Sequence, residues 1–244
     1  MFEIEHVRRE ELEILQLERL KKIVAWAYDK SAFYQSSFQR HGVTPEEIQT
    51  LADVKRLPFL TREEIRETDA FEFLTLPLSS VVRVTRLDGI KKFYTKGDIR
   101  NNVEMMIRCL MAADVLCGSI VGIGGDLSDS RLLDVLYALE SIGATVVFKE
   151  GFSVDTVVEL AEDTLTFKGF KLRVPPEGSF LYQCGKSYNV QEDNFLAEVV
   201  SGELVITTLT AQAQPLIRYR TGQAAKKICE PCSCGRTFTR ITLE

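Results

Sequence analysis

The chain has 244 residues, of which 45% are hydrophobic and 27% are charged, as is typical of a soluble globular protein. Its 35 acidic and 30 basic residues give a net charge of −5, which argues against a general binder of nucleic acid or of anionic membranes. The first residues do not resemble a signal peptide, and no apolar run approaches the ~20 residues that cross a bilayer. We therefore expect a cytoplasmic protein, with its six cysteines as free thiols or metal ligands rather than disulfides.

The N-terminal part of the chain predicts helices joined by short, capped turns. Apolar residues recur at helical spacing over residues 12–27. Capping boxes begin at Thr44 and at Thr61, each with glutamate at the third helical position. Two strands are expected after these helices, over residues 81–85 and 90–95, and the tight turn between them contains a glycine.

An alternating α/β stretch follows. Asp98 is expected to cap a helix with a continuous apolar face. A short buried strand over residues 119–123 precedes a second helix that ends at Gly143, and another strand is expected over residues 144–148. A strand, a helix and a strand of these lengths form a βαβ crossover, which implies a parallel sheet.

The last third of the chain is richer in segments that predict strands than the part before it. A further helix is expected over residues 154–161. Residues 180–183, 195–200 and 203–208 alternate in polarity and predict strands, with a tight turn at residues 201–202. We therefore predict an α/β fold.

Two parts are expected within this fold. Residues 1–150 form N-terminal helices and an α/β subdomain with the βαβ unit. Residues 151–244 form a β-rich subdomain that carries the expected metal site.

The strongest local signal is a group of three cysteines near the C-terminus. Cys229, Cys232 and Cys234 lie within six residues, so their thiolates can converge on one Zn²⁺ ion at ~2.3 Å. The alternative is three unpaired thiols, but clustered thiols without a metal are prone to oxidation. Four sulfur ligands leave no open position, so the expected role is structural.

The fourth ligand must come from elsewhere in the chain. Cys184, which precedes a glycine in the β-rich part, is the best candidate. The two histidines, His6 and His41, are expected in the N-terminal helices, far from the cysteines. The sequence thus predicts a zinc site formed by four cysteines.

Several segments resemble a known enzyme family. They are Leu17–Lys21, Phe33–Tyr34, Leu57–Thr61, Glu192–Asp193, Gly202–Leu209, Pro215–Gly222 and Cys234–Thr237. The strand that leads into a tyrosine-arginine-threonine turn at Tyr219 is similar to a segment of the adenylate-forming, or AMP-binding, superfamily. The continuation into Cys-Gly-Arg-Thr resembles the phenylacetate–CoA ligase branch. The resemblance implies a shortened N-terminal domain of that family and ancestry in CoA ligation.

Departures from the family pattern bear on its chemistry. The resemblance places a Ser/Thr/Gly-rich phosphate loop where this chain has Arg86–Lys92, which contains one glycine and is too short to wrap a triphosphate. It also implies a long stretch between residues 148 and 180 that completes the nucleotide subdomain, whereas only about thirty residues span this interval.

Two further positions in the implied nucleotide site are altered, and one is kept. Val174 stands where the family has a glutamate that holds Mg²⁺, and an aliphatic side chain cannot ligate that ion. Gln223 stands in place of the ribose-binding aspartate, and an amide accepts one hydrogen bond but lacks the charge of a carboxylate. The arginine of the implied site is retained as Arg220.

The end of the sequence adds one more expectation. The chain stops at Glu244, where the resemblance places a hinge and a mobile C-terminal domain with the family's catalytic lysine and CoA contacts. Together with the altered nucleotide site, this predicts that adenylation is lost and that neither ATP nor Mg²⁺ is used.

The resemblance also bears on the metal site. Some relatives look like zinc binders that use a cysteine and a histidine from the segment matching residues 184–189, with two more cysteines from the Cys-x-Cys-Gly-Arg turn. In this chain Asn189 stands near the histidine position, and Cys229 is the expected replacement. The ligands would then be Cys184, Cys229, Cys232 and Cys234.

Three functions remain open from the sequence. The first is a non-catalytic remnant that binds or regulates a partner, either a full-length relative or an acyl-transfer enzyme. The second is an enzyme, such as a transferase or thioesterase, that reuses an acyl or CoA pocket without ATP. The third is residual CoA ligation completed in trans. A shortened subdomain also predicts an exposed apolar sheet surface that a second copy or another protein covers.

Overall fold

The computed structural model contains two compact units. It describes residues 3–87, 89–148, 152–175, 181–230 and 232–243. Unit 1 consists of Met1–Asp98 and Cys184–Glu244, and unit 2 consists of Ile99–Gln183. The boundary expected at residue 150 falls on residues outside the described part of the chain.

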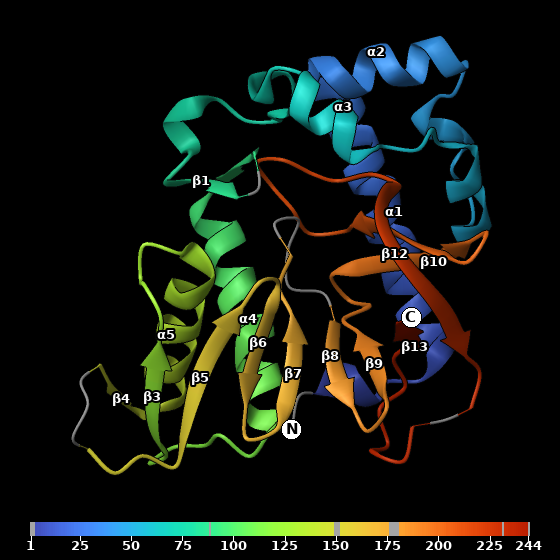
Figure 1. Cartoon of the computed structure of the whole chain (residues 1–244). Coiled ribbons are helices and arrows are strands. Elements are labelled where there is room, and N and C mark those ends of the chain that lie inside the picture. Colours follow the sequence, from blue (N-terminus) through green and yellow to red (C-terminus); the bar gives the residue numbers. More distant parts are fainter. Residues whose placement is uncertain (1–2, 88, 149–151, 176–180, 231, 244) are drawn as a thin grey trace. The chain divides into compact units, whose positions relative to one another are not determined.

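The helices of unit 1 precede its main sheet in the sequence (Figure 1). The three α-helices are α1 (Arg9–Lys30), α2 (Ala32–His41) and α3 (Arg62–Glu67), and the 3-10 turns are η1 (Glu3–His6), η2 (Pro45–Glu47), η3 (Leu51–Arg56), η4 (Ala70–Phe73) and η5 (Leu78–Ser80). The capping box at Thr61 is confirmed, since its hydroxyl accepts from the Glu64 N–H at 3.2 Å. The box at Thr44 opens only the single turn η2.

An aromatic cluster forms part of the core of unit 1. Phe33 and Phe73 pack with ring centroids 4.3 Å apart, and Tyr34 is buried beside them. The Tyr34 hydroxyl donates to the Pro215 carbonyl at 2.9 Å and accepts from the Ile217 N–H at 3.0 Å. Helix α2 is thereby joined to a segment almost two hundred residues later in the chain.

Unit 1 contains a hairpin and an antiparallel sheet. The hairpin pairs β1 (Arg83–Leu87) with β2 (Ile90–Tyr94). The sheet has the order β10-β11-β12-β13-β9, from β9 (Ser187–Val190), β10 (Phe195–Val200), β11 (Glu203–Thr208), β12 (Tyr219–Ile228) and β13 (Arg240–Leu243). The turn predicted between β10 and β11 is confirmed, with positive φ angles of 52° at Ser201 and 82° at Gly202.

Unit 2 contains the βαβ crossover expected from the sequence. Its elements are α4 (Lys96–Ala112, in this unit from Ile99), β3 (Ile120–Gly124), α5 (Ser130–Ile142), β4 (Thr145–Val147), β5 (Thr156–Ala161), β6 (Thr164–Phe167), β7 (Phe170–Arg173) and β8 (Leu181–Cys184). Strand β3 pairs in parallel with both β4 and β5. The strands from β5 to β8 follow one another as an antiparallel meander. The α/β fold is therefore confirmed.

Two sequence predictions in this region are wrong in detail. The sequence predicts a helix over residues 154–161, but Thr156–Ala161 form strand β5. Val158 is buried while Val157 is 40% exposed, which is the two-residue alternation of a strand and suits β-branched side chains. Helix α4 begins at Lys96, so Asp98 lies in its first turn, where its carboxylate accepts from the Thr95 N–H at 2.8 Å.

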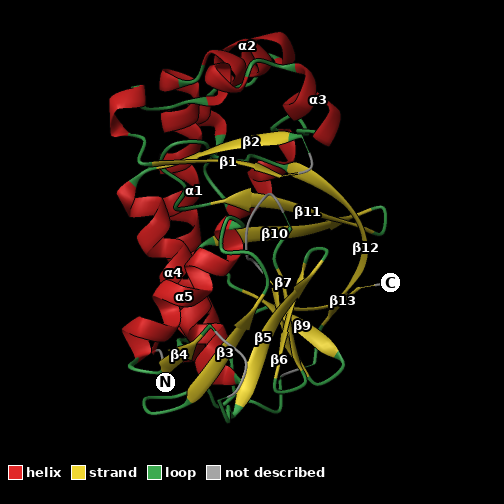
Figure 2. Cartoon of the chain, turned by 60° about the vertical axis from the view of Figure 1, so that its left-hand side comes forward, coloured by secondary structure: helices red, strands yellow, loops and turns green. Residues whose placement is uncertain are grey.

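One face of the unit 2 sheet is covered by helices. Figure 2 shows α4 and α5 on the same side of the strands, and their apolar side chains share a core with Val121, Val158 and Leu165. The opposite face, called here the outer face, includes Ile120 at 38% exposed and Val157 at 40%. Among the described residues, no helix has the length and apolar character needed to cross a membrane.

Candidate metal site and remnant nucleotide site

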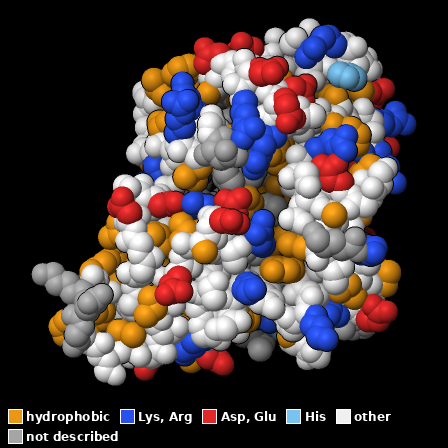
Figure 3. Space-filling model, viewed as in Figure 1, with side chains coloured by type: hydrophobic (Ala, Val, Ile, Leu, Met, Phe, Trp, Pro, Cys, Tyr) orange, Lys and Arg blue, Asp and Glu red, His pale blue; other side chains and the backbone are white. Residues whose placement is uncertain are grey.

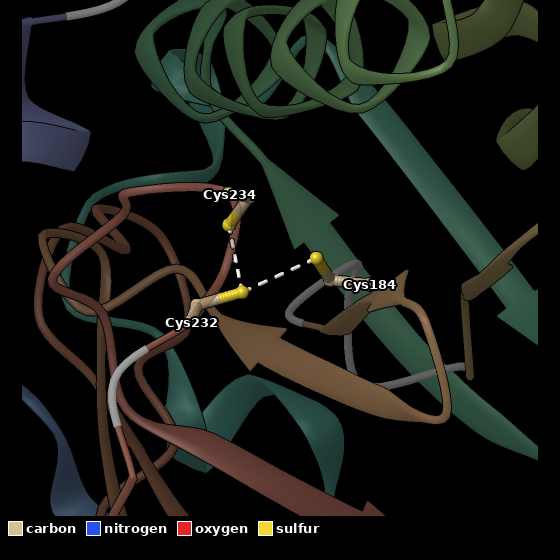
Figure 4. Close-up of side chains that lie close together, drawn as sticks. All are labelled: Cys184, Cys232 and Cys234. Carbon is tan, nitrogen blue, oxygen red and sulfur yellow. Dashed lines mark hydrogen bonds between the residues drawn. The ribbon is translucent and has the colours of Figure 1, made fainter.

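Three thiols of unit 1 lie together. Cys184 ends β8, and Cys232 and Cys234 lie in the connection between β12 and β13. The sulfur of Cys232 is 3.3 Å from that of Cys184 and 2.8 Å from that of Cys234 (Figure 4). All three sulfurs lie within 4.8 Å of one another, and we call them the thiol cluster. Thiols at these separations can bind a single metal ion.

Two glycine turns present the thiol cluster. Gly185 directly follows Cys184 with a φ of 62°, and the Ser187 hydroxyl donates to the Cys184 carbonyl at 3.0 Å. Residues 232–235 form a second turn, the cysteine turn, in which the Gly235 N–H donates to the Cys232 carbonyl at 3.0 Å. Gly235 has a φ of 78°, a left-handed conformation that residues with a side chain rarely adopt. Both turns direct the thiols toward one another (Figure 4).

The cysteines differ in acidity. Burial raises the pKa of Cys184 to about 12, and the neighbouring Cys232 adds to this effect. Burial also opposes ionisation of Cys234, but hydrogen bonds from Cys232 and Arg236 outweigh it and lower the pKa of Cys234 to about 7. Because the thiolate is the form that binds metals, the lowered pKa of Cys234 favours metal binding by its sulfur near neutral pH.

The predicted fourth thiol does not join this cluster. Cys229 is exposed, and its sulfur is not among the ligand atoms that lie within 4.8 Å of one another in the described part of the chain. Cys229 instead lines an open pocket of about 540 Å³, together with Arg9, Cys232 and Arg240.

The expectation that both histidines lie far from the cysteines is wrong for His6. Its Nδ1 atom is 3.0 Å from the Gly235 carbonyl oxygen, at the cysteine turn. The contact exists because η1 docks on this turn, where the Thr237 N–H donates to the Glu5 carbonyl at 2.9 Å. The two partners are 229 residues apart, and no local pattern in the sequence signals such a contact. His41 remains in α2, with its Nδ1 atom 2.8 Å from the Ser37 carbonyl.

The region expected to hold phosphates is a tight hairpin. Leu87 of β1 pairs directly with Ile90 of β2, so only residues 88 and 89 separate the paired strands along the chain. Asp88, the first of them, lies outside the described residues. A loop that wraps a triphosphate needs a longer run of backbone N–H groups than a two-residue turn can offer.

The two residues of the implied nucleotide site are engaged by nearby groups. Arg220 pairs with Glu203, and the Arg220 Nε donates to the Glu203 carboxylate at 2.9 Å. Burial opposes ionisation of Glu203, but hydrogen bonds from Arg220 and Gly222 hold the pKa of Glu203 below its ordinary value. The side-chain amide of Gln223 donates to the carbonyl of the adjacent Ala224 at 3.3 Å.

A second arginine, Arg218, lies beside this site, and the sequence did not indicate its structural role. Arg218 is buried and forms two hydrogen bonds of 3.1 Å with the Glu198 carboxylate. It also donates to the carbonyls of Lys55 and Leu57 at 2.9 Å, and it stacks on the Phe59 ring. The residues around Tyr219 therefore contain one arginine with a structural role and one on the surface.

Val174, the position at which the resemblance implies a magnesium-binding glutamate, lies in unit 2. Val174 follows β7 and is 1% exposed. Its side chain belongs to the same core cluster as Leu165 and Leu172. An apolar side chain in a packed core offers no oxygen to a hard cation.

Solved structures identify the class of fold. An open conformation of 2-hydroxyisobutyryl-CoA ligase, in complex with 2-HIB-AMP and CoA, matches with a TM-score of 0.82 and 16% identity. The match covers 98% of this chain and 76% of that one. The same ligase in the postadenylation state matches with a TM-score of 0.77 at 15% identity and covers 97% and 67% of the two chains. The fold is that of the adenylate-forming CoA ligases.

Phenylacetate–coenzyme A ligases align with nearly the whole of this chain. The chain is 29% identical to phenylacetate–coenzyme A ligase of Thermus thermophilus over 316 residues, which cover 98% of this chain and 71% of the relative. It is 24% identical to the Escherichia coli enzyme over 323 residues, with 98% and 72% covered. No protein-family model matches. The chain is a homologue of the phenylacetate–coenzyme A ligases, as its resemblance to them implied.

The alignments also bear on the interior of the chain. The aligned spans of 316 and 323 residues are longer than the 244 residues of this protein. Each relative therefore has residues within the aligned span that have no counterpart here. In this chain, β5, β6 and β7 lie in the interval between β4 and β8.

Proposed function

We propose that this protein is a phenylacetate–CoA ligase-like protein that does not adenylate carboxylic acids and acts as a binding or regulatory partner. The observation that carries the proposal is the β1–β2 hairpin, because its two-residue turn stands where the resemblance places the phosphate loop. The partner would be a full-length relative or an acyl-transfer enzyme.

The chemistry of adenylation supports this proposal. The reaction requires a triphosphate held in line with the carboxylate, Mg²⁺ between phosphate oxygens, and a fixed ribose. Val174 lies in a hydrophobic core, and the Gln223 amide is hydrogen bonded to its neighbour. Arg220 remains near the surface, but it pairs with Glu203, and one cation cannot orient a triphosphate alone.

Calorimetry and a pyrophosphate assay test the proposal. We expect no heat of binding for ATP with Mg²⁺, and no pyrophosphate release with a panel of aryl and acyl acids, with or without CoA. A full-length phenylacetate–CoA ligase serves as the positive control. Micromolar ATP affinity, or acid-dependent pyrophosphate release that scales with the protein concentration, would overturn the proposal.

The same samples distinguish the alternative functions. Release of free CoA from an acyl-CoA, measured with a thiol reagent that detects the freed thiol, would favour an enzyme that uses an acyl pocket without ATP. Activity that appears only when a separate C-terminal ligase domain is added would favour ligation completed in trans. The variant Gln223→Asp should not restore pyrophosphate release, because one carboxylate cannot replace a phosphate loop.

The thiol cluster supports a structural zinc ion as part of this function. Cys184, Cys232 and Cys234 would hold the ion, and the fourth ligand expected from the sequence is Cys229. Zinc would contribute to stability rather than to a reaction, since it would join separate segments of the β-rich region. Elemental analysis of protein purified without added metal should find one zinc per chain. Less than half an equivalent of metal would contradict this part of the proposal.

The outer face of unit 2 supports a second part of the proposal, the pairing of two copies of this chain. Ile120 and Val157 lie there on adjacent strands, and both are more than a third exposed. Figure 3 shows hydrophobic side chains over β3–β5, at the lower left of the view. Thr164 and Thr166 continue the outer face on β6 with polar groups, so the apolar part is confined to one end. We propose that a second copy of this chain covers the apolar end of the outer face, and that both copies use this end for the contact.

Light scattering tests this pairing. The protein should have about twice the mass of the 27.6 kDa chain, and Val157→Glu should shift it to monomer. Thr166→Glu, on a polar part of the outer face, is the matched control and should remain dimeric. A monomer over a broad range of concentration would refute the homodimer.

A further inference from the structure

Contacts from Glu5 and His6 dock η1 on the cysteine turn and the residues that follow it. The Thr237 N–H donates to the Glu5 carbonyl at 2.9 Å, and the Arg236 guanidinium lies 3.2 Å from the Glu5 carboxylate. His6 makes a further contact, with its Nδ1 atom 3.0 Å from the Gly235 oxygen. Gly235 directly follows Cys234, one of the clustered thiols. The segment before α1 is therefore held beside the thiol cluster.

The contact with Gly235 shows which nitrogen of the His6 ring carries a proton. A carbonyl oxygen only accepts hydrogen bonds, so the Nδ1 atom must carry the proton. In the neutral ring the Nε2 atom then has a free lone pair. This atom is buried and has no hydrogen-bond partner among the described residues. Burial of an unpaired polar atom is unfavourable, so the site is suited to a ligand that binds Nε2.

We propose that His6 is the fourth ligand of the zinc ion, through Nε2, and completes a Cys₃His site with Cys184, Cys232 and Cys234. The inference rests on the zinc part of the proposed function. Histidines that ligate zinc commonly donate their other ring N–H to a backbone carbonyl, which orients the ring, and His6 already makes this bond. Cys229, exposed and outside the thiol cluster, is then not a ligand.

Metal binding would draw these groups into a tetrahedron. Sulfur ligands at ~2.3 Å from zinc lie about 3.8 Å apart, so the thiols would separate from their present 2.8 and 3.3 Å. The His6 nitrogens are not among the atoms within 4.8 Å of one another, so the ring would move toward the thiols. The ion would then join η1, the end of β8 and the cysteine turn.

Two histidine variants provide the first test. His6→Ala removes the proposed ligand, and His41→Ala in α2 removes the other histidine of the chain. Competition with a chromophoric chelator should show that zinc affinity falls at least tenfold in His6→Ala and is unchanged in His41→Ala. His6→Gln, which keeps a side-chain N–H to donate to Gly235, should also lose affinity. Unchanged affinity in both His6 variants would overturn the proposal.

Cobalt spectroscopy identifies the ligands directly. Bound Co²⁺ gives thiolate charge-transfer absorption that depends on the number of sulfur ligands, and visible bands that depend on the ligand set. His6→Ala should shift the visible bands and keep the charge-transfer intensity, whereas Cys232→Ser should lower that intensity by about a third. Cys229→Ser should leave both unchanged. Loss of charge-transfer intensity in Cys229→Ser, with none of these effects in His6→Ala, would establish four cysteines instead.

Nitrogen NMR provides a readout that does not depend on a substituted metal. With ¹⁵N-labelled histidine, zinc should shift the Nε2 resonance of His6 and leave that of His41 in place. A His6 resonance that does not change in zinc-loaded protein would refute ligation. If the unmodified protein binds neither Zn²⁺ nor Co²⁺, the proposal of a zinc site is refuted. If it binds zinc with an affinity that does not depend on His6, only the proposal for His6 is refuted.

Discussion

The thiol cluster and the pair Arg220 and Gln223, two positions of the implied nucleotide site, belong to the same compact unit, but their polar groups are satisfied differently. In the thiol cluster the sulfurs contact one another, and the Nε2 atom of the adjacent His6 has no partner among the described residues. In the remnant site Arg220 is paired with Glu203, and Gln223 donates to a neighbouring carbonyl.

Under the proposals above, this difference is the one expected between a site that keeps its ligand and a site that has lost it. A site that binds a ligand keeps donor atoms available, at a cost in free energy when the ligand is absent. A site that no longer binds its ligand is free to satisfy those groups within the protein. Substitutions and metal removal can test this contrast between the two sites.

Removal of zinc should have the largest effect. Structural zinc sites contribute on the order of 10 kcal/mol in apparent binding free energy. A chelator should therefore lower the melting temperature sharply, and Cys232→Ser should have the same effect without a chelator. Cys117→Ser, at an exposed thiol outside the cluster, is the control and should melt like the unmodified protein. A melting temperature that does not respond to the chelator would remove the contrast between the two sites.

Two neighbouring arginines should differ strongly in their effect on stability. Arg218→Ala leaves the Glu198 carboxylate without its partner, so we expect a loss of about 3–5 kcal/mol in the free energy of unfolding. Arg220→Ala removes an ion pair at the surface, where water screens the charges, so the loss of stability should be much smaller. Urea denaturation measures both. Equal losses would contradict the assignment of a structural role to Arg218 alone.

Tyr34→Phe should cost about 1–3 kcal/mol, because it leaves the Pro215 carbonyl and the Ile217 N–H without the hydroxyl that bonds them. Burial raises the pKa of Tyr34 well above its ordinary value. The folded protein therefore keeps this proton when the unfolded chain has lost it, and the contribution of Tyr34 declines above about pH 10. The difference between the two proteins should narrow in that range. A constant difference from pH 8 to 11 would contradict this account.

The smallest effect is expected at Gln223. Its side chain is half-buried and donates to the carbonyl of the next residue, so Gln223→Ala should change stability by no more than about 0.5 kcal/mol. ATP binding should be absent both before and after the change. A loss of ATP binding on substitution would show that the remnant site still functions.

Local signals in the sequence predicted much of this fold. The capping box at Thr61, the turn at Ser201–Gly202 and the βαβ unit depend on residues close together in the chain, and all three are present. The prediction failed at β5, where an apolar run with helical length pairs in parallel with β3 instead. Strand pairing of this kind depends on distant residues, which local periodicity does not reveal.

The candidate site was predicted only in part for the same reason. Spacing alone indicated that Cys232 and Cys234 lie together, and the position of Cys184 beside a glycine added a third thiol. The approach of His6 depends on backbone contacts between Glu5 and Thr237, and such contacts have no pattern in a single sequence. The role of Arg218 was missed because its partners come from separate segments of the chain.

The docking of η1 on the cysteine turn also bears on folding kinetics. The contact between His6 and Gly235 joins residues 229 positions apart, a very large sequence separation. Contacts of this kind require closure of a long loop and are expected after the local structure has formed. An interaction that is absent from the folding transition state changes the unfolding rate and hardly affects the folding rate. Strengthening this contact should therefore prolong the lifetime of the folded state and leave the speed of folding nearly unchanged.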